Sequence, residues 1–327
     1  AILAVMLLMT ARVLAFYNQI YEAYYRAAQK AHWSIYQQSF LTLFTIILSV
    51  IVLYSGGGIV AISLINLIAI SLFLPAYILI GKKTLPVYKD FRGKISKELM
   101  LSFLKTGVGY LLSPAWQAIL LQGTTFVVRI VLGPAAVALY NTVRTVASVV
   151  TQLISTFNNS FFPDLQFEIG AGKKQNAQRI FTFNILASSF IGIGGALFLI
   201  IFGRWFYSIW TAKSLDPPMA MWIIFMTSVV FRSTWWGSAI VFKAVNKPYL
   251  LNIPCVIVAS VSVLMSYLLI NTSLGINGTA IGFLLMDLTL FLIIGRRAFR
   301  LMDVKFNSIK NELINTKATI KSFTFSK

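Results

Sequence analysis

The chain of 327 residues is 58% hydrophobic and only 11% charged, and its 28 basic and 9 acidic residues give a formal net charge of +19. Soluble domains carry about 25% charged residues, so this chain has too few to cover a water-soluble domain of its length. Disorder is excluded as well, because disordered segments are poor in apolar and aromatic residues. The composition predicts an all-α polytopic membrane protein, in which an excess of basic residues indicates cytoplasmic loops and no nucleic-acid partner.

Nine segments of mostly apolar residues are long enough to predict transmembrane helices, which need about 20 such residues each. In chain order these segments cover residues 1–24, 36–54, 57–80, 100–125, 134–160, 180–202, 219–241, 249–270 and 275–295. Glycine and proline mark the short connections between them, as at Gly133-Pro134 and Pro217-Pro218.

The basic residues predict the orientation in the membrane. Twenty-one of the 28 lie in alternate connections and in the C-terminal segment, whereas the other set of connections holds only Arg204 and Lys213. The positive-inside rule therefore predicts a cytoplasmic C-terminus. With nine spans, this places Ala1 outside. Because the chain opens in apolar sequence without a starting Met or a basic leader, we expect an odd number of leading spans to be missing.

Three short patterns recur along the chain and predict an internal repeat. The stretch 25–30 matches 242–247 and the pair 58–59 matches 275–276, both 217 positions apart, while 78–83 matches 292–297 at 214. The alternative explanation is that membrane helices commonly end in basic residues. A repeat of six helices predicts a twelve-helix protein of two parallel lobes with the site between them. The predicted domains are 1–98, the second half of the N-terminal lobe with a cytoplasmic linker; 99–295, a complete C-terminal lobe; and 296–327, a basic cytoplasmic tail.

Five basic residues lie inside predicted spans, where a central arginine costs about 2.5–3.5 kcal/mol on insertion scales. They are Arg12, Lys105, Arg129, Arg144 and Arg232. All five are candidates for a polar lumen that binds an anionic headgroup, and Arg12, Arg144 and Arg232 are favoured because they lie nearer mid-depth. Lys105 and Arg129 are near helix ends, so the alternative for these two is that they extend to the membrane surface.

Polar and aromatic residues accompany these cations in stripes at helical spacing. The candidates for the lumen wall, where they would contact sugars, are Gln19, Gln117, Asn141, Ser148, Gln152, Trp235 and Trp236. The alternative is that these side chains simply pack between helices.

Few acidic residues balance the lumen cations. Asp287 lies deep in a span and Glu22 lies near a helix end, and each is either a group that couples transport to H+ or Na+ or a counter-ion to an arginine. One cysteine, Cys255, and one histidine, His32, leave no disulfide and almost no metal chemistry, so we expect no catalytic residues, metal or cofactor.

The stretches 120–123 and 131–145 resemble the passage from the seventh to the eighth helix of a known family, the Wzx-like polysaccharide flippases. That family belongs to the multidrug/oligosaccharidyl-lipid/polysaccharide exporter superfamily. The segment Phe162-Pro163-Asp164-Leu165, followed by residues 170–173, resembles its next cytoplasmic loop, and 17–27 resembles the end of its fourth helix. The resemblance runs from about residue 10 to 300 and implies that the first three helices are missing.

This resemblance implies a multi-pass protein of the bacterial inner membrane. Such a protein flips polyprenyl-pyrophosphate-linked oligosaccharides by alternating access, for O-antigen, capsule or exopolysaccharide synthesis. Its expected partners are the lipid-linked oligosaccharide, membrane lipid, a coupling ion and a polysaccharide polymerase. A cation-coupled multidrug exporter of the same fold is the alternative function, although such exporters favour acidic sites. A membrane glycosyltransferase, ligase or acyltransferase is less favoured, because the spans and loops offer no obvious catalytic base or metal site.

Overall fold

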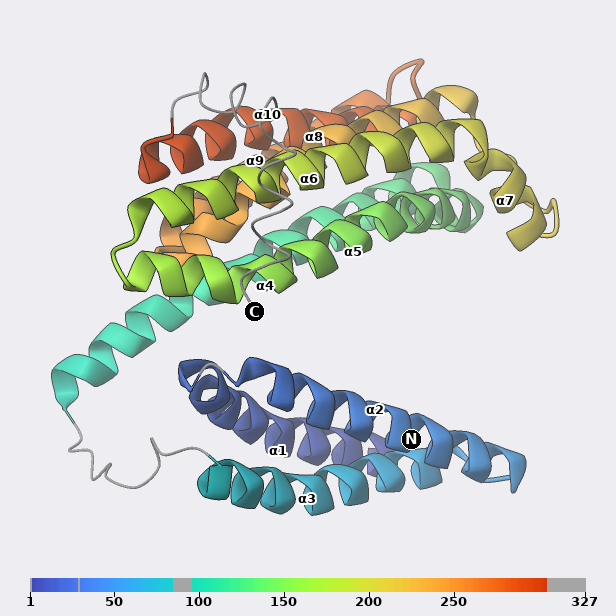
Figure 1. Ribbon diagram of the computed structural model, residues 1–327. Coiled ribbons are helices and arrows are strands. Elements are labelled where there is room, and N and C mark those ends of the chain that lie inside the picture. The colour runs from blue at the N-terminus through green and yellow to red at the C-terminus, as the bar shows by residue number, and fades with distance from the viewer. Residues whose placement is uncertain (1, 29, 85–95, 305–327) are drawn as a thin grey trace. The chain divides into compact units, whose positions relative to one another are not determined.

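The computed structural model describes residues 2–28, 30–84 and 96–304, which form helices and no strand (Figure 1). Nine of these helices are long and one is short, which confirms the predicted all-α polytopic fold. The chain divides into two units, Ala1–Ile95 and Ser96–Lys327. The linker from 85 to 95 and the tail from 305 lie outside the described residues, together with the lysines and the arginine that they carry.

The first unit consists of α1 (Ile2–Ala27), α2 (Ala31–Tyr54) and α3 (Ile59–Thr84), with α3 packed on both other helices. Its small core is aromatic: the rings of Tyr25 and Tyr77 stack at 5.0 Å between centroids. The Tyr77 hydroxyl lies 2.7 Å from Oγ of Ser34, which ties α3 to α2. Most large apolar side chains of α2 are exposed, as expected for a helix that contacts lipid.

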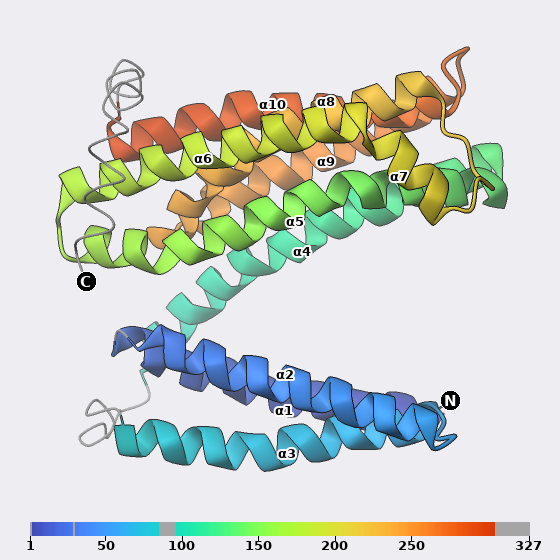
Figure 2. The ribbon, with the colours of Figure 1, turned by 45° about the vertical axis from the view of Figure 1, so that its right-hand side comes forward.

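The second unit contains α4 (Lys97–Leu132), α5 (Pro134–Gly170), α6 (Lys174–Ile201), α7 (Gly203–Trp210), α8 (Met219–Ala244), α9 (Pro248–Ile270) and α10 (Ile276–Met302). Helix α8 packs on α5, α6 and α10, while α4 packs on α5 and α9, and α9 packs on α10 (Figure 2). The long helices α4, α5, α8 and α10 thereby come together around the interior of this unit.

Several helix ends differ from the sequence prediction. Helices α4 and α5 extend well beyond the predicted 100–125 and 134–160, and only Gly133, at φ 84°, separates them. The segment Phe162-Pro163-Asp164-Leu165, which was predicted to be a loop, lies inside α5, because a proline can be accommodated within a helix without ending it. Helix α10 continues to Met302, so Arg296, Arg297 and Arg300 are helical and not part of a tail.

The aromatic stretch after α6 forms the short helix α7, whose two faces differ. Tyr207 is buried and its hydroxyl lies 2.8 Å from Oγ1 of Thr142, whereas Trp205 and Trp210 are about 60% exposed. Arg204 forms an ion pair with Asp216 at 2.6 Å. One face is therefore anchored to α5 and the other is free to lie in a membrane interface, as the predicted aromatic belt requires.

Seven helices are long and apolar enough to cross a membrane: α1, α2, α3, α4, α6, α9 and α10. Together with the comparisons reported below, they make the chain a multi-pass membrane protein. Helices α5 and α8 are long enough to cross a membrane but are not among these seven, and they carry Arg144 and Arg232.

The helix boundaries repeat at the offset that the sequence predicts. Helix α8 starts and ends 217 positions after α1, and α9 and α10 start 217 positions after α2 and α3. The turns that follow match too, since N of Lys30 donates to O of Tyr25 at 2.9 Å and N of Lys247 donates to O of Phe242 at 2.8 Å. This agreement in backbone geometry supports an internal repeat in addition to the similar basic helix ends.

Candidate functional site: a cationic, aromatic cavity

A cavity of about 410 Å³ lies inside the second unit and is lined by α4, α5, α8 and α10. Seven of the predicted site residues line it: Gln117, Arg144, Ser148, Gln152, Arg232, Trp235 and Trp236. Ser148 and Gln152 are exposed, so the cavity is open on the side of α5. The polar stripe along α5 is therefore directed into a hollow, as the helical spacing predicted.

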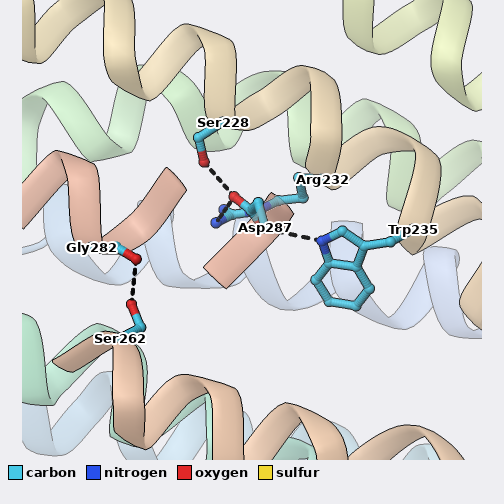
Figure 3. Close-up of polar contacts among 6 residues, drawn as sticks. All are labelled: Ser228, Arg232, Trp235, Ser262, Gly282 and Asp287. Atoms are coloured by element: carbon cyan, nitrogen blue, oxygen red, sulfur yellow. Dashed lines mark hydrogen bonds and ion pairs between the residues drawn. The ribbon is translucent and has the colours of Figure 1, made fainter. Parts of the chain in front are cut away.

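One wall of the cavity is built around the carboxylate of Asp287, which is fully buried (Figure 3). Arg232 donates to it twice, from Nε to Oδ1 at 3.1 Å and from Nη2 to Oδ2 at 2.8 Å. Nε1 of Trp235 donates to Oδ1 at 3.1 Å, and the Ser228 hydroxyl donates to Oδ2. Four donors thus satisfy a charge that could not otherwise be buried. Asp287 is therefore a counter-ion to Arg232 in this structure.

The Arg232 guanidinium is positioned by more than the ion pair. The guanidinium carbon, Cζ, lies 4.6 Å from the ring centroid of Phe283, which is a cation–π distance. The Arg232 side chain is 16% exposed and lines the cavity. Nearby on α9 and α10, Oγ of Ser262 donates to O of Gly282 at 2.6 Å and fixes α10 against α9 (Figure 3). These contacts hold the ion pair in place.

Arg144 provides the second positive charge and has no ion pair within the described part of the chain. Its Nη1 donates to O of Leu121 at 2.8 Å and to Oγ1 of Thr125 at 3.2 Å. Oγ1 of Thr125 also donates to Oδ1 of Asn141 at 3.2 Å, so Asn141 positions the threonine that binds the arginine. The guanidinium carbon also lies 5.2 Å from the ring centroid of Tyr140. The charge of Arg144 is therefore positioned by polar and aromatic contacts, and it has no carboxylate partner among the described residues.

Three indoles form the aromatic end of the cavity. The rings of Trp116, Trp235 and Trp236 lie 5.0 to 6.0 Å apart between centroids. Nε1 of Trp116 and Oγ1 of Thr151 are buried without a hydrogen-bond partner among the described residues, and both side chains line the cavity. Trp116 and Trp235 are buried and Trp236 is half-buried. Unpaired polar atoms in a hollow lined by aromatic rings are suited to a polar ligand that has apolar faces.

The remaining predicted site residues lie elsewhere. Lys105 and Arg129 are exposed on α4 and do not line the cavity, which fits the alternative that they extend to a membrane surface. Arg12, Gln19 and Glu22 belong to α1 of the first unit, where Arg12 and Gln19 are exposed. The role of all five in binding stays a prediction.

Sequence reasoning missed part of the site. It did not select Thr125 or the carbonyl oxygen of Leu121, which hold Arg144. The apolar residues Phe225, Phe283 and Met286 complete the lining. Only helical spacing could have indicated these residues, and in a chain with so many apolar residues that signal does not distinguish a cavity wall from a packed face.

No protein-family model matches this chain, and no curated protein matches it. Solved structures do. MATE in the bent conformation aligns with a TM-score of 0.81 at 16% identity, over 95% of this chain and 69% of that one. A multidrug resistance MATE family transporter of the MOP superfamily aligns in its outward-facing conformation with a TM-score of 0.78 at 15% identity, over 95% and 71% of the two chains. Its inward-facing counterpart gives 0.66 at 17% identity, over 95% and 72%.

The fold is therefore that of the MATE transporters. It agrees with the exporter superfamily that the sequence resemblance implies, and these structural neighbours are transporters and not enzymes. Identities of 14–17% establish the fold alone. The finer assignment to the Wzx-like flippases, and with it polysaccharide synthesis and an inner-membrane location, stays a prediction.

Proposed function

We propose that the protein is a membrane exporter that works by alternating access and carries an amphipathic substrate with an anionic head. Within that class, we propose the flipping of a polyprenyl-pyrophosphate-linked oligosaccharide from the cytoplasmic to the outer leaflet. The observation that carries this proposal is the unpaired Arg144 at the wall of an aromatic cavity.

The charge of the cavity favours an anion. Two arginines line it, whereas Asp287 is fully buried behind Arg232 and is engaged by Arg232 and its neighbours. The net charge is therefore positive, and it resides on the guanidinium that lacks an acidic partner. Guanidinium groups bind phosphate oxygens through two parallel hydrogen bonds, which suits a guanidinium that has no acidic partner among the described residues.

The aromatic end of the cavity supports the sugar portion of the proposed substrate. Trp116, Trp235 and Trp236 line the hollow with indole rings, of which Trp236 is the most accessible, and Gln117 and Gln152 offer amide donors and acceptors there. The polyprenyl tail would remain in lipid, because a cavity of about 410 Å³ accommodates a headgroup and not a long isoprenoid.

The internal repeat extends the proposal to Arg12 and Gln19. At the offset of 217 positions they correspond to Val229 and Trp236, both of which line the cavity of the second unit. Each unit would therefore direct the same side of its repeated helix toward substrate. We retain Arg12 and Gln19 as lumen residues on this ground.

A multidrug exporter is the second candidate, and the structural comparisons favour it over a flippase. The outward-facing and inward-facing neighbours are both described as multidrug resistance transporters. A transporter of cationic drugs would be expected to offer an unpaired carboxylate, whereas Asp287 is paired with Arg232. The fold therefore supports this candidate and the charge of the cavity supports the first.

The two candidates can be separated in cells that lack the gene and are complemented with the complete protein. We expect Arg144→Ala to abolish surface glycan with an unchanged protein level, because the headgroup loses its free guanidinium. Arg297→Ala is the matched control, since Arg297 is an exposed arginine of α10 outside the cavity. Normal glycan in the Arg144→Ala cells would exclude Arg144 as the headgroup ligand. Intact glycan with increased drug sensitivity in the deletion strain would instead support drug export.

A further inference from the structure

A second hollow, of about 600 Å³, lies on the second unit between α6 and α10. Its walls are mostly apolar: Ile185, Leu186, Phe291, Leu292 and Phe299. Thr234 and Ser238 of α8 form its floor. This α6–α10 groove shares no lining residue with the cavity of the proposed function.

The groove exists because α6 and α10 both pack on α8 and are joined to each other at one end. There the rings of Phe181 and Phe299 lie 5.5 Å apart, Lys174 pairs with Asp303 at 2.6 Å, and Gln178 donates to O of Met302 at 2.8 Å. Between these large side chains, Gly295 adds no side chain to the wall of the groove. A Cβ added to Gly295 would meet nothing within 4 Å. The hollow is therefore bounded by fixed helices.

The polar atoms of the floor are already paired with protein. The hydroxyls of Ser189 and Thr234 lie 2.9 Å apart, and Ser238 donates to O of Thr234 at 2.9 Å. No hydroxyl of the floor therefore needs water as a partner. A surface with satisfied polar atoms and apolar walls suits a hydrocarbon chain.

The mouth of the groove carries two arginines, Arg296 and Arg300, one helical turn apart on α10. Both are exposed, and neither has an ion-pair partner among the described residues. They lie at the end of α10 that the distribution of basic residues predicts to be cytoplasmic, where anionic lipids attract basic groups. From Phe291 to Arg300 the helix rises about 14 Å, so apolar walls continue inward from the charged mouth.

We propose that the α6–α10 groove binds one anionic phospholipid, with its phosphate at Arg296 and Arg300 and an acyl chain between α6 and α10. This inference goes beyond the proposed function, because the groove and its ligand are separate from the transport cavity. The charged mouth selects the head and the apolar walls accept the chain. The bound lipid would brace α6 against α10 at the end where only a few contacts join them.

The test measures phosphatidylglycerol binding to the purified complete protein by native mass spectrometry, with phosphatidylcholine as the neutral comparison. We expect the double variant R296Q/R300Q to weaken phosphatidylglycerol binding about 30-fold, because each basic group near an anionic surface contributes a factor of roughly five. R297Q is the matched control, since Arg297 is exposed on the same helix but donates to O of Leu250, away from the groove. It should bind phosphatidylglycerol as the unmodified protein does.

A second variant tests the acyl-chain part of the groove. Gly295→Leu adds a side chain to open space and leaves both arginines in place, so we expect it to displace the lipid without unfolding α10. The proposal is overturned if R297Q weakens binding as much as R296Q/R300Q, or if phosphatidylcholine binds as well as phosphatidylglycerol. It is also overturned if inorganic phosphate alone competes fully, which would indicate a simple anion site. Stronger lipid binding after deletion of residues 305–327 would show that the chain itself covers the groove.

Discussion

At the scale of single residues, the cavity depends on how its charges are paired. The sequence predicted Arg144, Arg232 and Asp287 as unusual residues within spans, and the structure separates their roles. Arg232 is neutralised by Asp287, whereas Arg144 is held by a carbonyl and a hydroxyl and has no ion-pair partner among the described residues. Spacing along one helix could not predict this difference, because ion pairing depends on which helices become neighbours and how each is rotated.

The Arg232–Asp287 pair leads to a prediction about stability. Removal of one member of a buried ion pair typically costs about 3–5 kcal/mol, because the other charge is left unpaired. We expect Asp287→Leu alone to lower the free energy of unfolding by that order, and the double change with Arg232→Met to restore most of it. Unfolding of the complete protein in mixed micelles would measure all four members of this cycle. Additive effects of the two changes would show that the pair is not energetically coupled.

At the scale of helices, the chain order and number of the long helices were largely predictable, because long apolar segments separated by Gly and Pro leave few alternatives. The ends of α4 and α5 could not be predicted, because only Gly133 separates the two helices and Pro163 does not end α5. The 217-residue offset was visible in short patterns, and the matching bounds of α1 and α8 now support it. Helix packing, in contrast, depends on small residues whose partners the sequence does not reveal.

Two glycines of α10 test that packing. A Cβ at Gly278 would lie 2.6 Å from the backbone carbon of Leu269 on α9, so Gly278→Ala must push the two helices apart. We expect a loss of about 1–3 kcal/mol, as for other overpacked sites. Gly295→Ala on the same helix meets nothing within 4 Å and should be neutral or stabilise by roughly 0.5–1 kcal/mol. Equal thermal stability of the two variants would contradict the close contact between α9 and α10.

At the scale of the whole molecule, fold and cargo are supported by different observations. The fold follows from the helices and from the alignment with MATE transporters at TM-scores up to 0.81. The cargo is inferred from charge and aromatic content within one cavity, and transporters of one fold can carry substrates of opposite charge. Composition predicted a membrane protein directly, whereas no composition distinguishes a flippase from a drug exporter.

Substrate translocation by the complete protein in proteoliposomes tests this account most directly. A polyprenyl-pyrophosphate-linked oligosaccharide with a fluorescent sugar would be placed in one leaflet, and its arrival in the other followed by quenching. The account predicts that the protein accelerates this transfer and that Arg144→Ala reduces it to the rate of protein-free vesicles. Uptake of a cationic dye by the same vesicles, with no transfer of the lipid above the protein-free rate, would contradict it.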